Sequence, residues 1–415
     1  MTEDRNTETG SAIAMRLQQV GMELREALLP IIGQVAGPSP RPSRLAERLE
    51  IDKSLASKLC RAYRTEEPLE FMHIVPAPAG LGIFLSAAAS ADVPSELCTR
   101  ATKGIARFQA LIDETPGGRA TLNAAISASS PEARLRNERS AKQAVYRAMS
   151  YLVGIQCESI ATAFIIRPGK APGWVDSIDV IHRIAMRRLR PTAPVGLLSY
   201  RLHGPHGEED MAKIRFETLD GQVPETVRSF FLPEFCSSPL PDMQEFKEGN
   251  QTTIALSKSG PPPEEPFNLT FAAIIRNALE QHRMEDIEHA WRIYLLHCPC
   301  KTLVRDVFIR DDLYVGTVPE ISLHIPSPRG PEIVKRPGEF GKMNTLDLSA
   351  PIEQIGTGLD LIEVKEIPSY ARLLSTVFER AGWDASRYRG YRTRITYPVP
   401  MVYMNWWFRL PEPPA

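Results

Sequence analysis

Three short stretches place histidines, cysteines or acids close enough together to suggest a metal site or acid-base chemistry. They are HCPC at 297–300, HRMEDIEH at 282–289 and HGPHGEED at 203–210. A structural zinc site needs a second pair of ligands, and HCPC has none nearby in the sequence. Carboxylate-histidine metal sites in helical bundles take acids from four helices, and 282–289 supplies one segment only. We interpret HCPC as two strand cysteines and 203–210 as a polar hairpin tip, and we predict no metal and no cofactor.

The motifs of common enzyme classes are absent from this chain. It has no GxGxxG after a strand, no GxxxxGK[ST], no GxSxG and no HExxH. The sequence therefore nominates no catalytic residue. An enzyme whose site a single sequence does not reveal stays open as an alternative.

Two arginine-rich stretches can bind phosphates or nucleic acid, or can simply form the surface of a sheet. In RIAMRRLRP at 183–191, alternation in a strand puts Arg188 and Arg190 on one face and Arg187 on the other. We expect an ion-paired sheet surface there. Near the C-terminus, arginines alternate with aromatic residues, a pattern that can stack on single-stranded bases. The favoured interpretation is a strand, in which adjacent Trp406 and Trp407 face opposite sides and at least one meets another domain or subunit.

The segment LAERLEIDKSLASKL at 45–59 combines basic and hydroxyl residues with helical spacing. Ser43 can cap a first helix, Ile51 closes a bend, and Asp52 can cap a second helix. The apolar positions predicted to face inward are Leu45, Ala46 and Leu49 in the first helix and Leu55, Ala56 and Leu59 in the second. The spacing predicts two short helices joined by a turn of three to four residues.

Residues 43–64 resemble the helix-turn-helix of bacterial DNA-binding regulators, on Leu45-Ala46, Leu49, Ile51, Ser54, Ala56, Ser57 and Leu59. The resemblance implies that the second helix lies in the major groove of double-stranded DNA. The residues expected to contact DNA are Arg44, Lys53, Ser54, Ser57, Lys58, Arg61 and Arg64. Two positions depart from the family. Ala56 stands where a β-branched residue is usual, and Glu50 replaces the usual glycine of the turn, where a positive φ would cost about 1 kcal/mol.

The composition is that of a globular protein and gives no global attraction to nucleic acid. The chain has 415 residues, 43% hydrophobic and 24% charged, with a formal net charge of -1. Six cysteines are few for this length, the first residues lack a signal-peptide pattern, and no apolar run reaches the length of a membrane span. We predict a cytoplasmic protein that contacts no membrane.

Changes in periodicity predict a multidomain chain with an all-α N-terminal part and a following α+β part with mainly antiparallel sheet. We expect a disordered tail over 1–11, a helical domain over 12–66, a helical connector over 67–151 and an α+β domain over 152–415. A division of the last domain into two subdomains that meet near 260 stays open. Helices are expected near 79–89, 93–112, 131–151, 268–296 and 368–382.

Three functions are compatible with this sequence. The first is a sequence-specific or nucleoid-type DNA-binding protein, a bacterial transcription regulator whose large C-terminal domain serves oligomerisation or sensing. The second is a homo-oligomeric assembly protein in which the helical unit binds protein. The third is an enzyme with an unrecognised site. The helix-turn-helix resemblance favours the first, and a symmetric dimer would place two recognition helices about one DNA turn apart.

Overall fold

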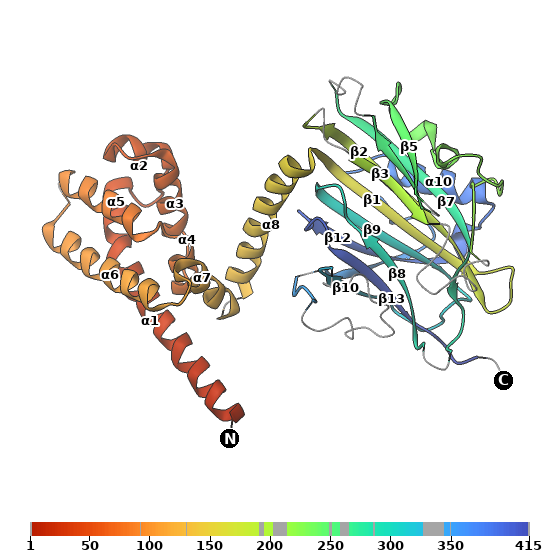
Figure 1. Ribbon diagram of the computed structural model, residues 1–415. Coiled ribbons are helices and arrows are strands. Elements are labelled where there is room, and N and C mark those ends of the chain that lie inside the picture. The colour runs from red at the N-terminus through yellow and green to blue at the C-terminus, as the bar shows by residue number, and fades with distance from the viewer. Residues whose placement is uncertain are drawn as a thin grey trace. The chain divides into compact units, whose positions relative to one another are not determined.

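The chain folds into two compact units, Met1–Ser140 and Ala141–Ala415. The computed structural model describes residues 2–413 except 92, 130, 191–194, 202–213, 249–250, 258–264, 285–286, 327–343 and 349. Figure 1 shows that the first unit is helical and that the second is built mostly from strands. N-terminal helices followed by a mixed, largely antiparallel sheet region agree with the expected order of an all-α part and an α+β part.

The helical unit consists of short and medium helices around the long first helix. They are α1 (Thr2–Ala36), α2 (Pro42–Leu49), α3 (Lys53–Tyr63), α4 (Pro68–Ile74), α5 (Pro78–Ser90), α6 (Ser95–Glu114) and α7 (Gly118–Ser129). A further helix, α8 (Pro131–Val153), begins in this unit and ends in the second. Helix α1 has an apolar stripe, at a spacing of three, four or seven residues, that is buried at Leu17, Leu24, Leu28 and Ile31. Helix α1 ends at Ala36, and Pro42 occupies the first turn of α2, where proline is tolerated.

One apolar core runs through the helical unit from Leu17 in α1 to Ile126 in α7. Helix α1 packs on both α4 and α6, so the helices on either side of residue 66 share this core and do not form a separate connector. The structure also gives helix from Thr2, where composition predicts a disordered tail over 1–11. A polar segment can continue an existing helix because each added residue gains a hydrogen bond without a new nucleus.

The second unit is organised around a seven-stranded sheet in the order β11-β12-β9-β1-β2-β7-β4. Its strands are β1 (Ile155–Pro168), β2 (Trp174–Arg188), β4 (Arg215–Glu217), β7 (Phe267–Glu280), β9 (Cys300–Arg310), β11 (Ile352–Thr357) and β12 (Tyr388–Thr396). Neighbours β1 and β9 are parallel, and the other pairs are antiparallel. Strands from both sides of residue 260 therefore share one sheet.

Two three-stranded sheets complete this unit. One has the order β10-β13-β8, from β8 (His289–Leu295), β10 (Glu320–His324) and β13 (Tyr403–Arg409). The other has the order β3-β6-β5, from β3 (Val195–Arg201), β5 (Met243–Glu248) and β6 (Gln251–Leu256). Short 3-10 turns η1 (Val227–Phe230), η2 (Pro233–Phe235) and η3 (Ala385–Arg387) lie in the connections.

The seven-stranded sheet is covered on both faces by different elements. Helix α10 (Tyr370–Ala381) packs on one face, where Ala161 and Ala163 of β1 leave room for Leu373 and Leu374. On the other face, Phe164 and neighbouring strand residues pack against Trp406 and Phe408 of β13. Alternation along each strand therefore decides which covering layer a side chain enters.

The helix predicted over 268–296 is wrong, because β7 and β8 occupy that range. Strand β7 lies between β2 and the short edge strand β4 and is largely buried on both faces. It therefore forms a nearly continuous apolar run that periodicity cannot distinguish from a buried helix. Helices expected near 79–89, 93–112, 131–151 and 368–382 are confirmed by α5, α6, α8 and α10.

The expectation that Trp406 or Trp407 meets another domain or subunit is also wrong. Trp406 is fully buried in the layer between β13 and the large sheet. Trp407 is 1% exposed, packs against Trp291 of β8 and donates a hydrogen bond from Nε1 to Ser322 Oγ at 2.7 Å. Neighbours within the chain therefore cover both tryptophans.

Among the described residues, no single helix is long and apolar enough to cross a membrane. Taken together, α4 and α5 pass the same length and composition test, but they are bent by 90° at the break between them. Leu69 and Phe71 of α4 and Leu81 and Phe84 of α5 are buried in the helical core, which accounts for the apolar character of this pair.

Candidate functional site

Helices α2 and α3 pack on each other through the apolar positions expected from the sequence. Leu45 and Leu49 of α2 and Ala56 and Leu59 of α3 are buried in the helical core. Ala46 is half-buried against the same core, where a small side chain suits close packing of the two helices. Burial of these side chains fixes which face of α3 points outward.

The turn between α2 and α3 depends on Glu50, which has φ 52° and ψ 38° in the left-handed region. Its backbone N–H and that of Ile51 both donate to the Ala46 carbonyl. A residue with a Cβ is disfavoured there relative to glycine by about 1 kcal/mol. Glu50 therefore has the strained backbone that a non-glycine residue at this turn implies, in the loop that joins the two helices.

Asp52 caps α3, as expected. Its Oδ1 accepts a hydrogen bond from the Ser54 backbone N–H at 2.7 Å, which satisfies one of the free donors at the helix start. Hydrogen bonds from Ser54 hold the pKa of Asp52 below its usual range. A charged carboxylate at this end is also favoured by the helix dipole.

The residues expected to contact DNA lie largely in solvent. Those exposed are Arg44, Lys53, Ser54, Lys58, Arg61 and Arg64, and Ser57 is half-buried. Ser54, Ser57, Lys58 and Arg61 form one stripe along α3 because they are three or four residues apart. Arg64 also donates to the Pro40 carbonyl at 3.1 Å, which anchors it at the end of the helix.

Charge pairing distinguishes this surface from the α1–α6 side of the same unit. Arg16 pairs with Glu114, and Arg107 pairs with Glu23, across α1 and α6. By contrast, no ion pair is formed within the described chain by Lys53, Lys58 or Arg61 of α3. Residues 41–64 contain seven basic and three acidic residues. The outward side of α3 is therefore a locally positive surface on a chain of balanced charge.

The cysteines of HCPC lie in the interior of the second unit. Cys300 opens β9, and Cys298 Sγ lies 3.1 Å from Cys157 Sγ of β1. Burial raises the pKa of both the Cys157 thiol and the Cys300 thiol well above the ordinary value for cysteine. No group of three or more possible metal ligands occurs among the residues described by the structure.

The other two histidine-containing stretches lie wholly or partly outside the described residues. Residues 203–210 and Glu285 lie outside the described residues. His289 opens strand β8 and does not lie on a helix.

The ion-paired surface expected for RIAMRRLRP is wrong for two of its four arginines, which are buried. Arg188 donates from Nη1 to the Ser257 carbonyl at 2.7 Å. Arg183 is 6% exposed, and its Nε and Nη1 are buried without a hydrogen-bond partner. Arg187 and Arg190 are exposed. The sequence did not indicate that this strand is covered on both faces.

A chain of hydrogen bonds that sequence reasoning missed connects Ser369, His182 and Thr270. Thr270 Oγ1 donates to the Phe235 carbonyl at 2.7 Å, so His182 Nδ1 donates to Thr270 at 2.8 Å and Nε2 accepts from Ser369 Oγ at 3.0 Å. Burial lowers the pKa of His182 to about 4, which keeps the ring neutral. The residues are 88 and 187 positions apart, so no local pattern signals them.

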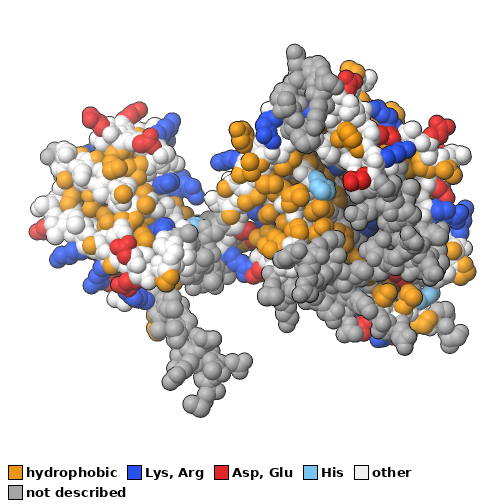
Figure 2. All heavy atoms as spheres, in the orientation of Figure 1, with side chains coloured by type: hydrophobic (Ala, Val, Ile, Leu, Met, Phe, Trp, Pro, Cys, Tyr) orange, Lys and Arg blue, Asp and Glu red, His pale blue; other side chains and the backbone are white. Residues whose placement is uncertain are grey.

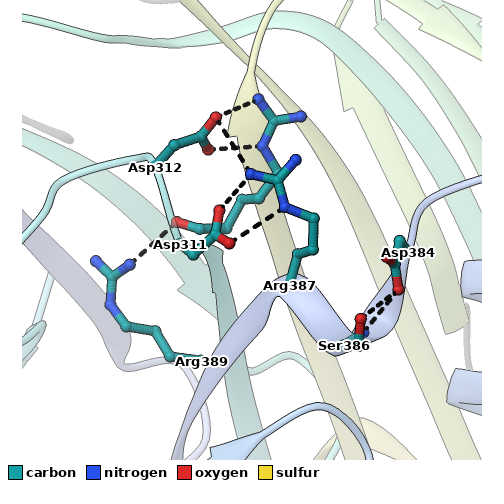
Figure 3. Close-up of polar contacts among 7 residues, drawn as sticks. Asp311, Asp312, Asp384, Ser386, Arg387 and Arg389 are labelled. Atoms are coloured by element: carbon teal, nitrogen blue, oxygen red, sulfur yellow. Dashed lines mark hydrogen bonds and ion pairs between the residues drawn. The ribbon is translucent and has the colours of Figure 1, made fainter.

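Acids at the end of β9 are fully engaged with arginines. Figure 3 shows Arg387 directed at Asp311 and Asp312, while Asp384 accepts from Ser386. Hydrogen bonds from Arg387 hold the pKa of Asp311 below its usual range. These contacts tie the end of β9 to the start of β12 and leave no carboxylate of this group poised as a general base.

No protein-family model matches this chain, and no curated protein matches it. Among solved structures, it is similar to one from Parabacteroides distasonis described as a "putative protease", at 9% identity and a TM-score of 0.25. That similarity covers 61% of this chain and 40% of the other protein. A likeness at that level carries no conclusion about activity.

Proposed function

We propose that this protein binds double-stranded DNA through α3 and acts as a transcription regulator or nucleoid-type protein. The observation that carries the proposal is the outward face of α3, where Lys53, Lys58 and Arg61 are exposed without acidic partners. Cationic and hydroxyl side chains are those that contact phosphates and base edges. The family resemblance of residues 43–64 supplies the docking mode, with α3 in the major groove.

The second unit is proposed to serve sensing or oligomerisation. A homodimer would present two copies of α3 to half-sites about one helical turn apart, which raises affinity for a pseudo-palindromic site. Light scattering on the full chain tests this part: a monomer at working concentration would overturn the dimer and leave DNA binding by one copy of α3 to be tested separately.

The direct test is fluorescence anisotropy with labelled genomic fragments across a salt series. Lys53→Glu combined with Lys58→Glu should abolish binding, because two phosphate-neutralising charges are reversed on the contacting face. A milder pair, Lys53→Gln with Lys58→Gln, should reduce the slope of log K against log salt by about 2.

The matched control is Lys103→Glu with Arg139→Glu, which reverses two exposed charges on α6 and α8. This variant should bind DNA as the parent does. Equal loss of binding in both double variants would show a non-specific charge effect. Binding that survives reversal on α3 would exclude α3 as the DNA-contacting helix and favour a protein-binding role for the helical unit.

A further inference from the structure

The layer between the seven-stranded sheet and β8 contains more positive charge than the described residues neutralise. Arg183 of β2 lies opposite Ile160 of β1, and Arg305 of β9 lies opposite Thr162 of β1. Because Ile160 and Thr162 are two residues apart, both arginines project into this layer from the same face of the sheet. Arg292 of β8 enters the layer from the opposite side and is paired with Asp179 of β2. Neither Arg183 nor Arg305 pairs with a carboxylate in the described chain.

Both guanidinium groups are nine-tenths or more buried and incompletely hydrogen-bonded. Arg183 is 6% exposed and Arg305 is 3% exposed. Arg305 donates from Nη1 to the Met404 carbonyl at 2.8 Å, but its Nε has no partner, and Arg183 leaves both Nε and Nη1 unpaired. A buried charge of this kind costs several kcal/mol unless something compensates it. Such an arrangement is expected where a ligand supplies the missing anion.

Aromatic and aliphatic side chains surround the two arginines. The Arg305 guanidinium carbon lies 4.9 Å from the centre of the Tyr294 ring, and that of Arg183 lies 5.5 Å from the centre of the Phe271 ring. Burial raises the pKa of Tyr294, and the charges of Arg183 and Arg305 act in the opposite direction. Tyr294 is therefore a neutral hydroxyl donor beside two cations.

This layer borders an apolar cluster that is only partly closed. Ile160, Phe271 and Leu303 are buried in the cluster, whereas Ile181 and Tyr294 pack against it and keep part of their surface. Val153, at the end of α8, is another half-buried member. Figure 2 shows hydrophobic side chains gathering on the surface of this unit near the end of α8.

We propose that Arg183, with Arg305 and Tyr294, binds the anionic head of a small organic acid whose apolar body packs on the Ile181 side of the cluster. The shared chemistry is a carboxylate or phosphate monoester attached to a hydrocarbon group. A guanidinium can bind either head through two parallel hydrogen bonds. The site lies wholly within the second unit and does not depend on DNA binding by α3.

The test is isothermal titration of the full chain with octanoate, octyl phosphate, octylamine and inorganic phosphate. Saturable one-to-one binding is expected for octanoate or octyl phosphate, and these two arms identify the head group. Octylamine carries the same tail with the opposite charge and should not bind. Binding of octylamine as tight as that of the anions, or no binding of either anion, would overturn the proposal. If inorganic phosphate bound as tightly as octyl phosphate, the proposal that the ligand has an apolar body would be contradicted.

The residue assignment is tested with Arg183→Met and a matched control on the same strand, Arg187→Met. Arg183→Met should weaken binding of the preferred anion at least tenfold, whereas Arg187→Met, whose side chain is exposed, should leave it unchanged. Arg183→Met removes an unpaired buried charge and should fold at least as well as the parent, so lost binding will not reflect unfolding. Unchanged binding in Arg183→Met would contradict the assignment.

Discussion

The two faces of the seven-stranded sheet differ in how completely their buried charged groups are paired. Under α10, Asp306 of β9 accepts from Arg392 Nε and Nη2 of β12 at 2.9 and 2.7 Å, and Arg392 also donates to the Ile362 carbonyl. His182 on this face has both ring nitrogens hydrogen-bonded. Under β8 and β13, Arg183 and Arg305 keep unpaired nitrogens.

The difference indicates that one face stabilises the fold and the other is available for a ligand. Adjacent residues of one strand, Arg305 and Asp306, belong to the two different environments because strand side chains alternate. A face selected for stability pairs each charge, whereas departures from that rule concentrate at functional sites.

The largest expected effect comes from breaking the paired face. Asp306→Asn should lower the free energy of unfolding by about 3–5 kcal/mol, because it leaves the buried Arg392 charge uncompensated. Urea denaturation monitored by tryptophan fluorescence measures this change. The double variant Asp306→Leu with Arg392→Met should recover most of the loss, and a double variant as unstable as Asp306→Asn would show that shape, not charge pairing, is decisive.

His182 should make this face sensitive to acid. Its pKa is about 4 in the folded protein and 6.5 as the ordinary value, so the unfolded chain binds the proton more readily between these pH values. Stability should therefore be complete above pH 6.5 and fall as pH drops toward 4, by up to about 3 kcal/mol. Urea unfolding at several pH values, compared with His182→Gln, measures it. Parallel pH profiles for the two proteins would contradict the assignment to His182.

On the face under β8 and β13, removal of a buried charge should raise the free energy of unfolding. Arg183→Met should raise the free energy of unfolding of the ligand-free protein by about 1–2 kcal/mol, because an apolar side chain replaces an unpaired charge in an apolar layer. Thermal or urea unfolding of the variant measures the gain, and Arg187→Met should stay within about 0.5 kcal/mol of the parent. A clear loss of stability in Arg183→Met would show that the guanidinium is compensated in the folded protein.

A smaller stabilisation is expected in the α2–α3 turn, where the unfavourable feature is backbone strain at Glu50. Glu50→Gly should stabilise the helical unit by roughly 1 kcal/mol or less, because glycine accepts φ 52° without a Cβ penalty but is more flexible when unfolded. Circular dichroism during thermal unfolding follows this unit. Glu50→Ala keeps the Cβ and should give no gain, so equal stabilisation by both substitutions would point to charge and not to backbone strain.

The helical unit could be predicted largely from local patterns. The two helices α2 and α3, the cap at Asp52 and the Glu50 turn each depend on residues within a few positions of one another. The candidate DNA-contacting residues were found the same way, because helical spacing alone decides which side chains share a face.

The anion site could not be predicted, although Arg183 was noticed as part of a basic run. Its surroundings come from β2, β7, β8 and β9, whose order in the sheets is not encoded in any short segment. Sequence also mistook β7 for a helix, since a strand buried on both faces loses the alternation that identifies it.

By itself, then, the sequence determined the helical part and the basic helix α3, since helices form through contacts three and four residues apart. Only the tertiary structure decided that Asp306 meets Arg392 while Arg183 and Arg305 meet no acid in the described chain. The physical reason is that pairing of buried charges depends on strand register between distant segments, and register is set by the packing of both sheet faces.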